Sequence, residues 1–367
     1  MESGEPSRVK PVRPAMRGLL FAASFLVLLA GIQLFGFTDR TNSFFAFTVQ
    51  NPLSALFLGA GYIASIAIEA LAGRQRIWAN ARIAVPAVFV FTVLTLTVTL
   101  MHLGQLHLGS QFALHTRVVA CSWLAIYVVV PILLLIVSVV QLRTPGADPP
   151  RSTGVPSWTR ALLGMQAIVL FGFGIALFAV PGLAAPLWPW KLTTLTAQAI
   201  GAWLIALGVA AAQALYERDA RRLRPAALGY VLLAVALLIA LARYPRQFAW
   251  GSASGILYLI FLTTILVVGT TGLACGLSRR NRQSASTSHT TSRARLTTAE
   301  FNRDRLDSLV LVGSSWSSEQ VDDRTGSPFS RHEVSGSPCV AQVPEQRPQS
   351  VAQVPKPESR AAVGAAD

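Results

Sequence analysis

The sequence predicts an all-α membrane protein, in which eight transmembrane helices form two parallel four-helix repeats and a disordered C-terminal tail follows. The composition is 52% hydrophobic and only 13% charged, whereas a soluble chain carries about 25% charged residues. The apolar residues stand in long blocks and lack the 3.6-residue period of a half-buried helix. One stretch of the apolar region also occurs twice, which indicates an internal duplication.

Eight apolar blocks are long enough to cross a membrane as helices. Each has about 17–23 residues, which covers a hydrocarbon core of roughly 30 Å at about 1.5 Å per residue. The first block is too long for the apolar core of a cleavable signal peptide, so we expect a retained anchor helix. The seventh block is the shortest. The blocks are 19–37, 52–72, 83–103, 118–140, 161–180, 195–215, 226–242 and 255–277.

Residues 59–110 align without a gap on residues 201–252, at a shift of 142 positions. Most aligned positions that are not identical exchange one apolar residue for another. Because each repeat contains an even number of helices, both are expected to insert the same way round and to be related by an axis along the membrane normal. Identical pairs include Gly59 and Gly201, Arg76 and Arg218, Arg82 and Arg224, Gln105 and Gln247, and Gly109 and Gly251.

The duplication divides the chain into five parts. The tail is rich in Ser, Thr, Arg, Gln and Pro, and such a composition buries too little apolar surface to offset the entropy of ordering. We therefore expect the tail to be disordered. The parts are a cytoplasmic N-terminal segment (1–17), repeat 1 (18–141), a turn-rich cytoplasmic linker (142–157), repeat 2 (158–277) and the cytoplasmic tail (278–367).

The net charge of +14 is explained by membrane topology. Lys and Arg gather in alternate loops, and the loops richer in these residues stay in the cytoplasm, which places both termini there. Basic residues interleaved with aromatics on a folded surface, as nucleic-acid binding requires, are not found. Arg far outnumbers Lys, which occurs only at Lys10, Lys191 and Lys356. This usage is typical of a GC-rich bacterial genome and predicts a multi-pass protein of a bacterial plasma membrane.

The third apolar block carries a polar stripe. Thr92, Thr95, Thr99 and His102 are spaced i, i+3, i+7 and i+10, so they share one face of a helix. Their counterparts in repeat 2 are Ala234, Leu237, Leu241 and Tyr244. The stripe predicts the lining of a solute or ion pathway. The alternative is that the hydroxyls bond carbonyls of their own helix and face a neighbouring helix.

Three imidazoles, those of His102, His107 and His115, lie in or beside one outer loop. They are weak candidates for an external metal site, because no Cys, Asp or Glu of that loop completes the ligand set. We predict no metal and no cofactor. The three cysteines, Cys121, Cys275 and Cys339, form no disulfide or metal spacing.

Small residues recur at four-residue spacing in the second and sixth blocks. Such stripes let helix backbones approach closely in lipid. We expect them to serve helix packing, with a pathway lined by small residues as the alternative. The stripe residues are Ala60, Ala64, Ala202, Ala206 and Ala210.

Glu69 is the one carboxylate inside an apolar block. An acid at membrane depth is a functional candidate by default. Glu69 lies close to the cytoplasmic end of its block, however, and Arg74 follows five residues later. Structural pairing with Arg74 and coupling to protons are therefore both open.

The run from Trp188 to Trp203, which contains Trp-Pro-Trp-Lys-Leu-Thr, resembles a segment of uncharacterised multi-spanning membrane proteins of GC-rich, actinobacterial-like bacteria. The resemblance covers this run and, loosely, the helices around it, and it implies no activity. The sequence contains no nucleophile elbow, Walker sequence or zincin helix. We therefore expect no enzyme.

Two functions remain. The first is a small-solute transporter or permease-like protein, supported by the duplication and the polar stripe. The second is a membrane scaffold or sensor whose phosphorylatable Ser/Thr-rich tail recruits a cytoplasmic protein partner. In both cases the lipid bilayer is a partner, and nucleic acid is not.

Overall fold

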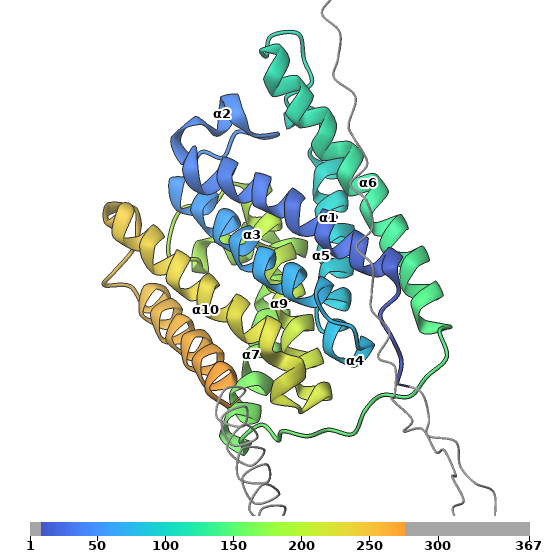
Figure 1. Cartoon of the computed structure of the whole chain (residues 1–367). Helices are drawn as coiled ribbons and strands as arrows, with labels where there is room; N and C mark the ends of the chain where they lie inside the picture. Colours follow the sequence, from blue (N-terminus) through green and yellow to red (C-terminus); the bar gives the residue numbers. More distant parts are fainter. Residues whose placement is uncertain (1–8, 276–367) are drawn as a thin grey trace, which may run out of the picture. The chain divides into compact units, whose positions relative to one another are not determined.

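A computed structural model describes residues 9–275, and these residues form helices joined by short connections, with no strand. Seven of their helices are long and apolar enough to cross a membrane, which identifies an integral membrane protein (Figure 1). Beside them stands a shorter apolar helix, α5 (Val85–Met101), of 17 residues. The seven are α1 (Pro14–Gly31) with the π-helical turn Ile32–Gly36, α3 (Pro52–Gly73), α6 (Leu114–Leu142), α7 (Ser157–Ala179), α9 (Thr194–Glu217), α10 (Ala220–Arg243) and the helix Ala253–Cys275.

Short helices occupy the connections. Within residues 9–275, the only β-type pairs are isolated bridges, such as Pro11 with Ile77. The short elements are α2 (Thr41–Phe44), α4 (Trp78–Ala81) and α8 (Pro181–Ala184), with 3₁₀ turns at Thr38–Arg40, Leu103–Gln105, Ala185–Leu187 and Pro245–Gln247.

Local sequence signals set the helix ends. Pro52 begins α3, and the Asn51 side chain accepts a hydrogen bond from the Leu53 amide at 2.9 Å. Thr193 and Thr196 form a capping box at the start of α9, which satisfies amides that have no partner in the helix. Arg218 adopts a left-handed conformation, φ 50°, and ends α9. Asp219 then accepts from the Arg221 amide and starts α10.

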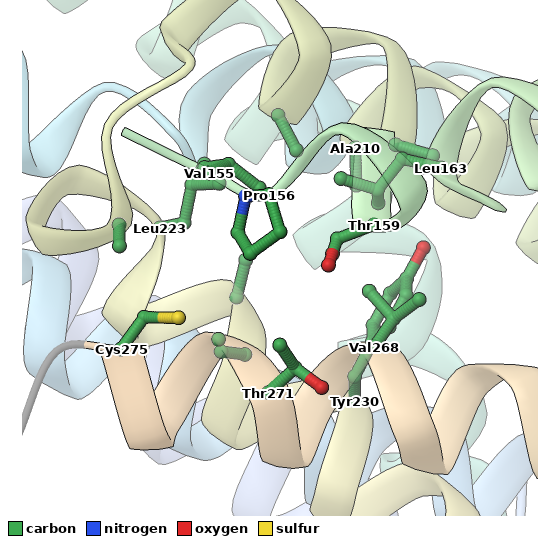
Figure 2. Close-up of a pocket in the computed structure, with 16 residues that line it drawn as sticks. Val155, Pro156, Thr159, Leu163, Ala210, Leu223, Tyr230, Val268, Thr271 and Cys275 are labelled. Carbon is green, nitrogen blue, oxygen red and sulfur yellow. The ribbon is translucent and has the colours of Figure 1, made fainter. Parts of the chain in front are cut away.

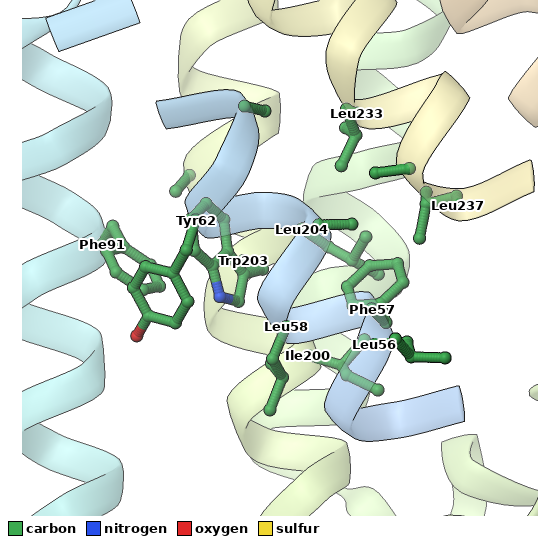
Figure 3. Close-up of a cluster of buried hydrophobic side chains, with 14 of the residues drawn as sticks. Leu56, Phe57, Leu58, Tyr62, Phe91, Ile200, Trp203, Leu204, Leu233 and Leu237 are labelled. Carbon is green, nitrogen blue, oxygen red and sulfur yellow. The ribbon is translucent and has the colours of Figure 1, made fainter. Parts of the chain in front are cut away.

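Helices α3 and α9 lie at the centre of the bundle. α3 packs along α1 and α10, and α9 packs along α7 and α5, while α5 also contacts α6. In Figure 1, α3 lies between α1 and α10. Figure 3 shows the core where α3, α5, α9 and α10 meet, with Tyr62, Phe91 and Trp203 side by side. Helix α6 exposes many large apolar side chains, such as Val118 and Ile132, as expected of a lipid-facing helix.

One end of the bundle, which we call the Arg82 end, ties four segments together. The Lys10 amide donates to the Ala147 carbonyl, and the Val12 amide donates to the Arg76 carbonyl, each within 3.0 Å. The connection between α6 and α7, residues 143–156, is held against the start of α10 because the Ala220 amide donates to the Thr153 carbonyl at 2.9 Å. The expected disordered tail, residues 278–367, lies outside the described residues.

The opposite end, which we call the His102 end, holds the far termini of the same helices. The Tyr244 hydroxyl donates to the Asp39 carboxylate at 2.7 Å, and the Arg243 guanidinium donates to the Phe35 carbonyl at 3.0 Å. These contacts join the end of α10 to the turn that follows α1. The pKa of Tyr244 is raised, first by burial and then by its bond to Asp39.

Candidate functional site

A cavity of about 110 Å³ lies among α1, α3, α5, α6 and α9. We call it the Glu69 cavity. Most of its wall is hydrocarbon from residues such as Leu26, Ala87 and Ala206. The polar groups come chiefly from α3, which contributes Tyr62, Ser65 and Glu69, with Thr92 from α5 and Tyr127 from α6.

Glu69 is 2% exposed, and its Oε2 atom has no hydrogen-bond partner. No ion pair among residues 9–275 includes Glu69, so the pairing with Arg74 that the sequence left open is not formed. At about 100° per residue, positions five apart on a helix point roughly 140° apart. Arg74, at the C-cap of α3, is exposed, whereas Glu69 is part of the wall of the cavity. The side chain is a buried acid without a counter-ion.

Two tyrosines from different helices meet beside Glu69. The hydroxyls of Tyr62 and Tyr127 are 2.7 Å apart and hydrogen-bonded. One hydroxyl donates and the other accepts, so the accepting tyrosine keeps its own O–H hydrogen, and neither tyrosine bonds Glu69. The acid is the charged group of this wall that has an oxygen without a partner.

Five aromatic rings line the same cavity, those of Tyr62, Phe91, Trp123, Tyr127 and Trp203. The Trp203 ring centroid lies 4.0 Å from that of Phe91 and 5.1 Å from that of Tyr62. Trp123 and Tyr127 are 4.6 Å apart. The rings form one continuous aromatic cluster, because Phe91 also lies 6.2 Å from Tyr127.

The threonine stripe of α5 divides between two cavities. Thr92 lines the Glu69 cavity, whereas Thr95 and Thr99 line a neighbouring cavity of about 40 Å³. Thr92 donates its hydroxyl hydrogen to the Phe89 carbonyl at 2.9 Å, and Thr99 donates to the Thr95 carbonyl at 2.8 Å. Thr99 also accepts from the Trp123 indole at 3.1 Å. These bonds match the alternative given for the stripe, in which hydroxyls serve their own helix.

The three histidines do not come together. His102 ends α5, where it bonds Gln198 of α9 at 2.6 Å and Gln105 at 3.1 Å. His107 is buried and bonds Thr48 at 3.0 Å and the Phe45 carbonyl at 2.9 Å. Burial lowers the pKa of His107. His115 is exposed beside the ring of Phe44. Residues 9–275 contain no group of three metal-ligating side chains.

The small-residue stripes take part in both packing and the cavity. Ala60, Ala64, Ala202 and Ala206 are buried. A Cβ on Gly229 of α10 would lie 3.3 Å from the Ala64 carbonyl oxygen, so α10 approaches the α3 backbone closely. Ala206 and Ala210 line the Glu69 cavity. Ala206 is thus both buried and part of the cavity wall, and helix packing and a pathway lined by small residues both stay predictions.

A cluster of charges lies beyond the Arg82 end of the cavity. Glu217, the last residue of α9, is 0% exposed and pairs with both Arg82 and Arg222, the latter at 2.9 Å. Arg82 also pairs with Asp148 of the 143–156 connection. The hydrogen bond to Glu217 is the main cause of the raised pKa of Arg82. Ile83 and Ala84, which follow Arg82 in the sequence, line the cavity, so the cluster lies next to this part of its wall.

Two further cavities lie in the second half of the chain. One, of about 650 Å³, lies among α7, α9, α10 and the helix Ala253–Cys275, and its wall is almost wholly apolar. The other has about 40 Å³, and Figure 2 shows Thr159, Tyr230 and Cys275 among the residues that line it. The hydroxyls of Thr159 and Tyr230 have no hydrogen-bond partner. Neither cavity is lined by an acidic or basic side chain.

The sequence singled out Thr92 and Glu69 of this site but missed Tyr62, Tyr127 and Trp203. A signal that could have found Tyr62 is the alignment of residues 59–110 on 201–252. At this shift of 142, Tyr62 aligns with Leu204 and Glu69 with Ala211, whereas Tyr127 lies outside the aligned stretch. The comparison that singled out the threonines thus also singles out Tyr62 and Glu69, which have apolar residues at the shifted positions.

No family model, no curated protein and no solved structure matches this chain.

Proposed function

We propose that this protein is a small-solute transporter of a bacterial plasma membrane and that its solute binds in the Glu69 cavity. The observation that carries the proposal is the unpartnered Glu69 carboxyl in a cavity among apolar helices. Burying an acid without a partner is costly, and in membrane proteins such groups mark solute, ion or proton pathways. A purely structural helix bundle would gain stability from an apolar residue at this position.

The two-repeat architecture is part of the proposal, and matching helix contacts support it. α1 packs on α3 as α7 packs on α9, and α3 packs on α10 as α9 packs on α5. A Cβ on Gly59 would lie 3.0 Å from the backbone nitrogen of Phe35, and one on Gly201 would lie 2.8 Å from that of Phe178. Phe35 and Phe178 are 143 positions apart, one more than the shift between the glycines. Under the shift of 142, α3 corresponds to α9 and α5 to α10, so each of these contacts in one half has a counterpart in the other half.

Eight membrane crossings are also part of the proposal. Although α5 has only 17 residues, it accompanies α9 from end to end. Before α5, Arg82 pairs with Glu217, the last residue of α9, and after α5, His102 bonds Gln198 near the start of α9. A helix that reaches both ends of a 24-residue candidate span covers the same depth of bilayer.

The orientation follows from the basic loops. The Arg82 end carries Arg74, Arg76 and Arg82 after α3 and Arg218, Arg221 and Arg222 after α9. We assign this end to the cytoplasm because Lys and Arg accumulate in cytoplasmic loops. Both termini are then cytoplasmic, and the Arg82–Glu217 cluster closes the solute site on the cytoplasmic side. Opening that cluster is the step that would release the solute inward.

The proposal is tested by flux into proteoliposomes that contain the full chain. A panel of labelled cationic, neutral and anionic solutes is offered to the parent and to Glu69→Gln. The matched control is Gln166→Leu, since Gln166 is equally buried but lies on α7 outside the Glu69 cavity. We expect one solute class to enter faster than into protein-free liposomes, and Glu69→Gln to abolish that flux while Gln166→Leu keeps it. Equal flux with and without protein for the whole panel would refute transport.

The alternative function, a scaffold or sensor, depends on residues 278–367. Deletion of these residues separates the two proposals in the same preparation. The transporter is expected to keep its flux without the tail, whereas a scaffold would lose capture of its cytoplasmic partner.

A further inference from the structure

The wall of the Glu69 cavity contains one acidic carboxyl and no basic group. Of the side chains that line it, only Glu69, Tyr62 and Tyr127 can ionise, and neither Lys, Arg nor His is among them. The nearest cations on neighbouring segments are already engaged. Arg17 of α1 donates to the Gly73 carbonyl at 3.0 Å, and Arg82 pairs with Glu217 and Asp148. An anionic solute would find no cation to pair with and would be repelled by an ionised Glu69, whereas a cationic solute could pair with the Glu69 carboxylate.

A bare metal ion does not suit this wall. Hard cations take about six or more oxygen ligands, or keep part of their water shell. Here the Tyr62 and Tyr127 hydroxyls bond one another and the Thr92 hydroxyl donates to its own helix. The remaining surface is mostly hydrocarbon and aromatic ring. The wall therefore offers one charged ligand, Glu69, and hydroxyls that for the most part already bond one another or their own helix, which is a poor replacement for the hydration shell of a divalent ion.

An organic cation fits the same wall. Aromatic rings attract cations through the negative charge of their faces, and the attraction grows when the site is shielded from water. Five such rings line the cavity that holds the acid, and Trp203, the ring type that binds cations best, contacts both Phe91 and Tyr62. Alkyl groups on the cation would in turn bury against Leu26, Ala87 and Ala206.

The size of the cavity limits the ligand. Its volume of about 110 Å³ is somewhat below the roughly 150 Å³ that accepts benzene in an engineered protein cavity. An occupant of no more than about five non-hydrogen atoms therefore fits. Tetramethylammonium and small alkylamines belong to this class.

We propose that the solute is a small organic cation, an alkylated ammonium, which pairs with the Glu69 carboxylate and is enclosed by the rings of Tyr62, Phe91, Trp123, Tyr127 and Trp203. This inference rests on the proposed transport function and names its substrate class. A buried acid without a counter-ion is most stable when protonated, so we expect binding to release one proton: the protonated acid and the free cation become an ion pair and a free proton. The exchange is electroneutral, and a pH gradient across the membrane drives accumulation.

Binding to the purified full-length protein in detergent tests the ligand class without transport. The probes are tetramethylammonium chloride, the uncharged and similarly sized tert-butanol, and sodium acetate. Calorimetry in buffers of different ionisation enthalpy counts the protons released. We expect tetramethylammonium to bind with release of one proton, and tert-butanol and acetate to show at least a hundredfold weaker binding. Raising the pH tightens binding of tetramethylammonium.

Variants then locate the site. Glu69→Gln is expected to weaken tetramethylammonium binding at least a hundredfold and to remove the proton release, while Gln166→Leu binds as the parent does. Trp203→Phe keeps a ring and is expected to retain most of the affinity, whereas Trp203→Leu loses about three- to thirtyfold. If Glu69→Gln does not fold, the two Trp203 variants decide. Equal affinity in Trp203→Phe and Trp203→Leu would overturn the aromatic enclosure.

The outcomes separate this inference from the function on which it rests. Binding of tetramethylammonium with proton release but without flux in proteoliposomes would refute transport and keep the ligand class. Flux of a neutral solute that depends on Glu69, without binding of tetramethylammonium, would keep transport and overturn the organic cation. Unchanged tetramethylammonium binding in Glu69→Gln would overturn the site itself.

Discussion

Glu69 contributes the one carboxylate oxygen among the six buried side-chain atoms of residues 9–275 that have no hydrogen-bond partner. Buried polar groups in folded proteins are nearly always hydrogen-bonded, because an unpaired one costs about 1–3 kcal/mol. Glu69 keeps one oxygen without a partner, although it lies only a few residues from the end of α3. An apolar residue would avoid this cost, and Ala211 stands 142 positions later, at the shift that aligns residues 59–110 on 201–252.

The first prediction follows from this cost. Glu69→Leu removes the unpaired acid at similar volume and is expected to raise the free energy of unfolding by about 1–3 kcal/mol, while it abolishes flux. Thermal unfolding and flux of the same preparation measure both effects. Gln166→Leu removes one buried oxygen without a partner but also the hydrogen bond from the Gln166 amide to Thr264 at 3.0 Å, so the two effects offset and no such gain is expected. Lower stability of Glu69→Leu would show that the acid has a structural partner.

The second prediction concerns His107. Its ring is held neutral by burial between Thr48 and Phe45, and burial lowers its pKa. The unfolded chain, with an ordinary pKa of about 6.5, then binds more protons than the folded chain. Stability is therefore full above about pH 6.5 and falls as the pH drops below that value, by up to about 1.4 kcal/mol per pH unit.

Unfolding of the parent, His107→Gln and His115→Gln between pH 5 and 8 checks this slope. His107→Gln is expected to flatten the loss of stability below pH 6.5 attributable to this group. His115 is exposed, and its replacement is expected to leave the profile as in the parent. An unchanged slope in His107→Gln would assign the acid sensitivity to another residue.

At the scale of the helices, hydropathy predicted where the long helices lie but not where they end. The block expected at 226–242 belongs to α10, which begins at Ala220 and includes Arg221, Arg222 and Arg224. Arg residues lower the hydropathy of a sequence window and so argue against a membrane span there. Arg222 is nevertheless buried, because it pairs with the Glu217 carboxylate. The block expected at 83–103 forms a helix of only 17 residues. Composition cannot foresee an ion pair between neighbouring helices.

The third prediction concerns close helix contacts. A Cβ on Gly201 would lie 2.8 Å from both the Gly174 carbonyl oxygen and the Phe178 backbone nitrogen, and these backbone atoms cannot turn aside. Gly201→Ala is expected to cost about 1–3 kcal/mol of stability by forcing α7 and α9 apart. Gly172→Ala on α7 is the matched control, since nothing lies within 4 Å of a Cβ there.

The control variant should gain up to about 1 kcal/mol from the better helix propensity of Ala. Thermal unfolding of both variants gives the comparison. Equal stability of the two would mean that α7 and α9 do not pack as closely as described.

The cavity was only partly predictable, because its wall is formed by contacts between helices. Thr92 and Glu69 stand out because they are polar residues in apolar blocks. Tyr62, Tyr127 and Trp203 are amphipathic or apolar residues that any membrane helix tolerates. Their role arises from a meeting of α3, α6 and α9, which are far apart along the chain. A single sequence carries no record of such contacts.

For the whole molecule, the Arg82 cluster joins the two halves of the chain at one end. Glu217, with two arginine partners, is fully buried. The fourth prediction is that Glu217→Gln leaves Arg82 and Arg222 without their shared anion and costs about 3–5 kcal/mol. Proteoliposomes with this variant are also expected to leak the transported solute. Arg74→Gln, at an exposed position without a recorded ion pair, is the control and should change neither property.

The fifth prediction concerns topology. Eight crossings place both ends of the chain on the same side of the membrane, whereas seven would place them on opposite sides. Reporters fused before residue 1 and after residue 277 are expected to be active only in the cytoplasm. Reporters with opposite sidedness would show that α5 fails to cross, and they would remove the basis for two equivalent repeats.

The packing of α3 and α9 bears on how the protein is made. Besides α1, α3 packs mainly on α10, and α5 packs mainly on α9. Each half of the chain therefore packs against helices of the other half. During synthesis the first four apolar helices enter the bilayer before α9 and α10 exist. Until then the Glu69 cavity has the walls that α1, α3, α5 and α6 supply but lacks the side formed by α9, and an acid open to lipid on that side is strongly unfavourable. The nascent first half therefore needs either water or an assisting membrane chaperone at its side, and its lifetime in that state is set by the speed of translation.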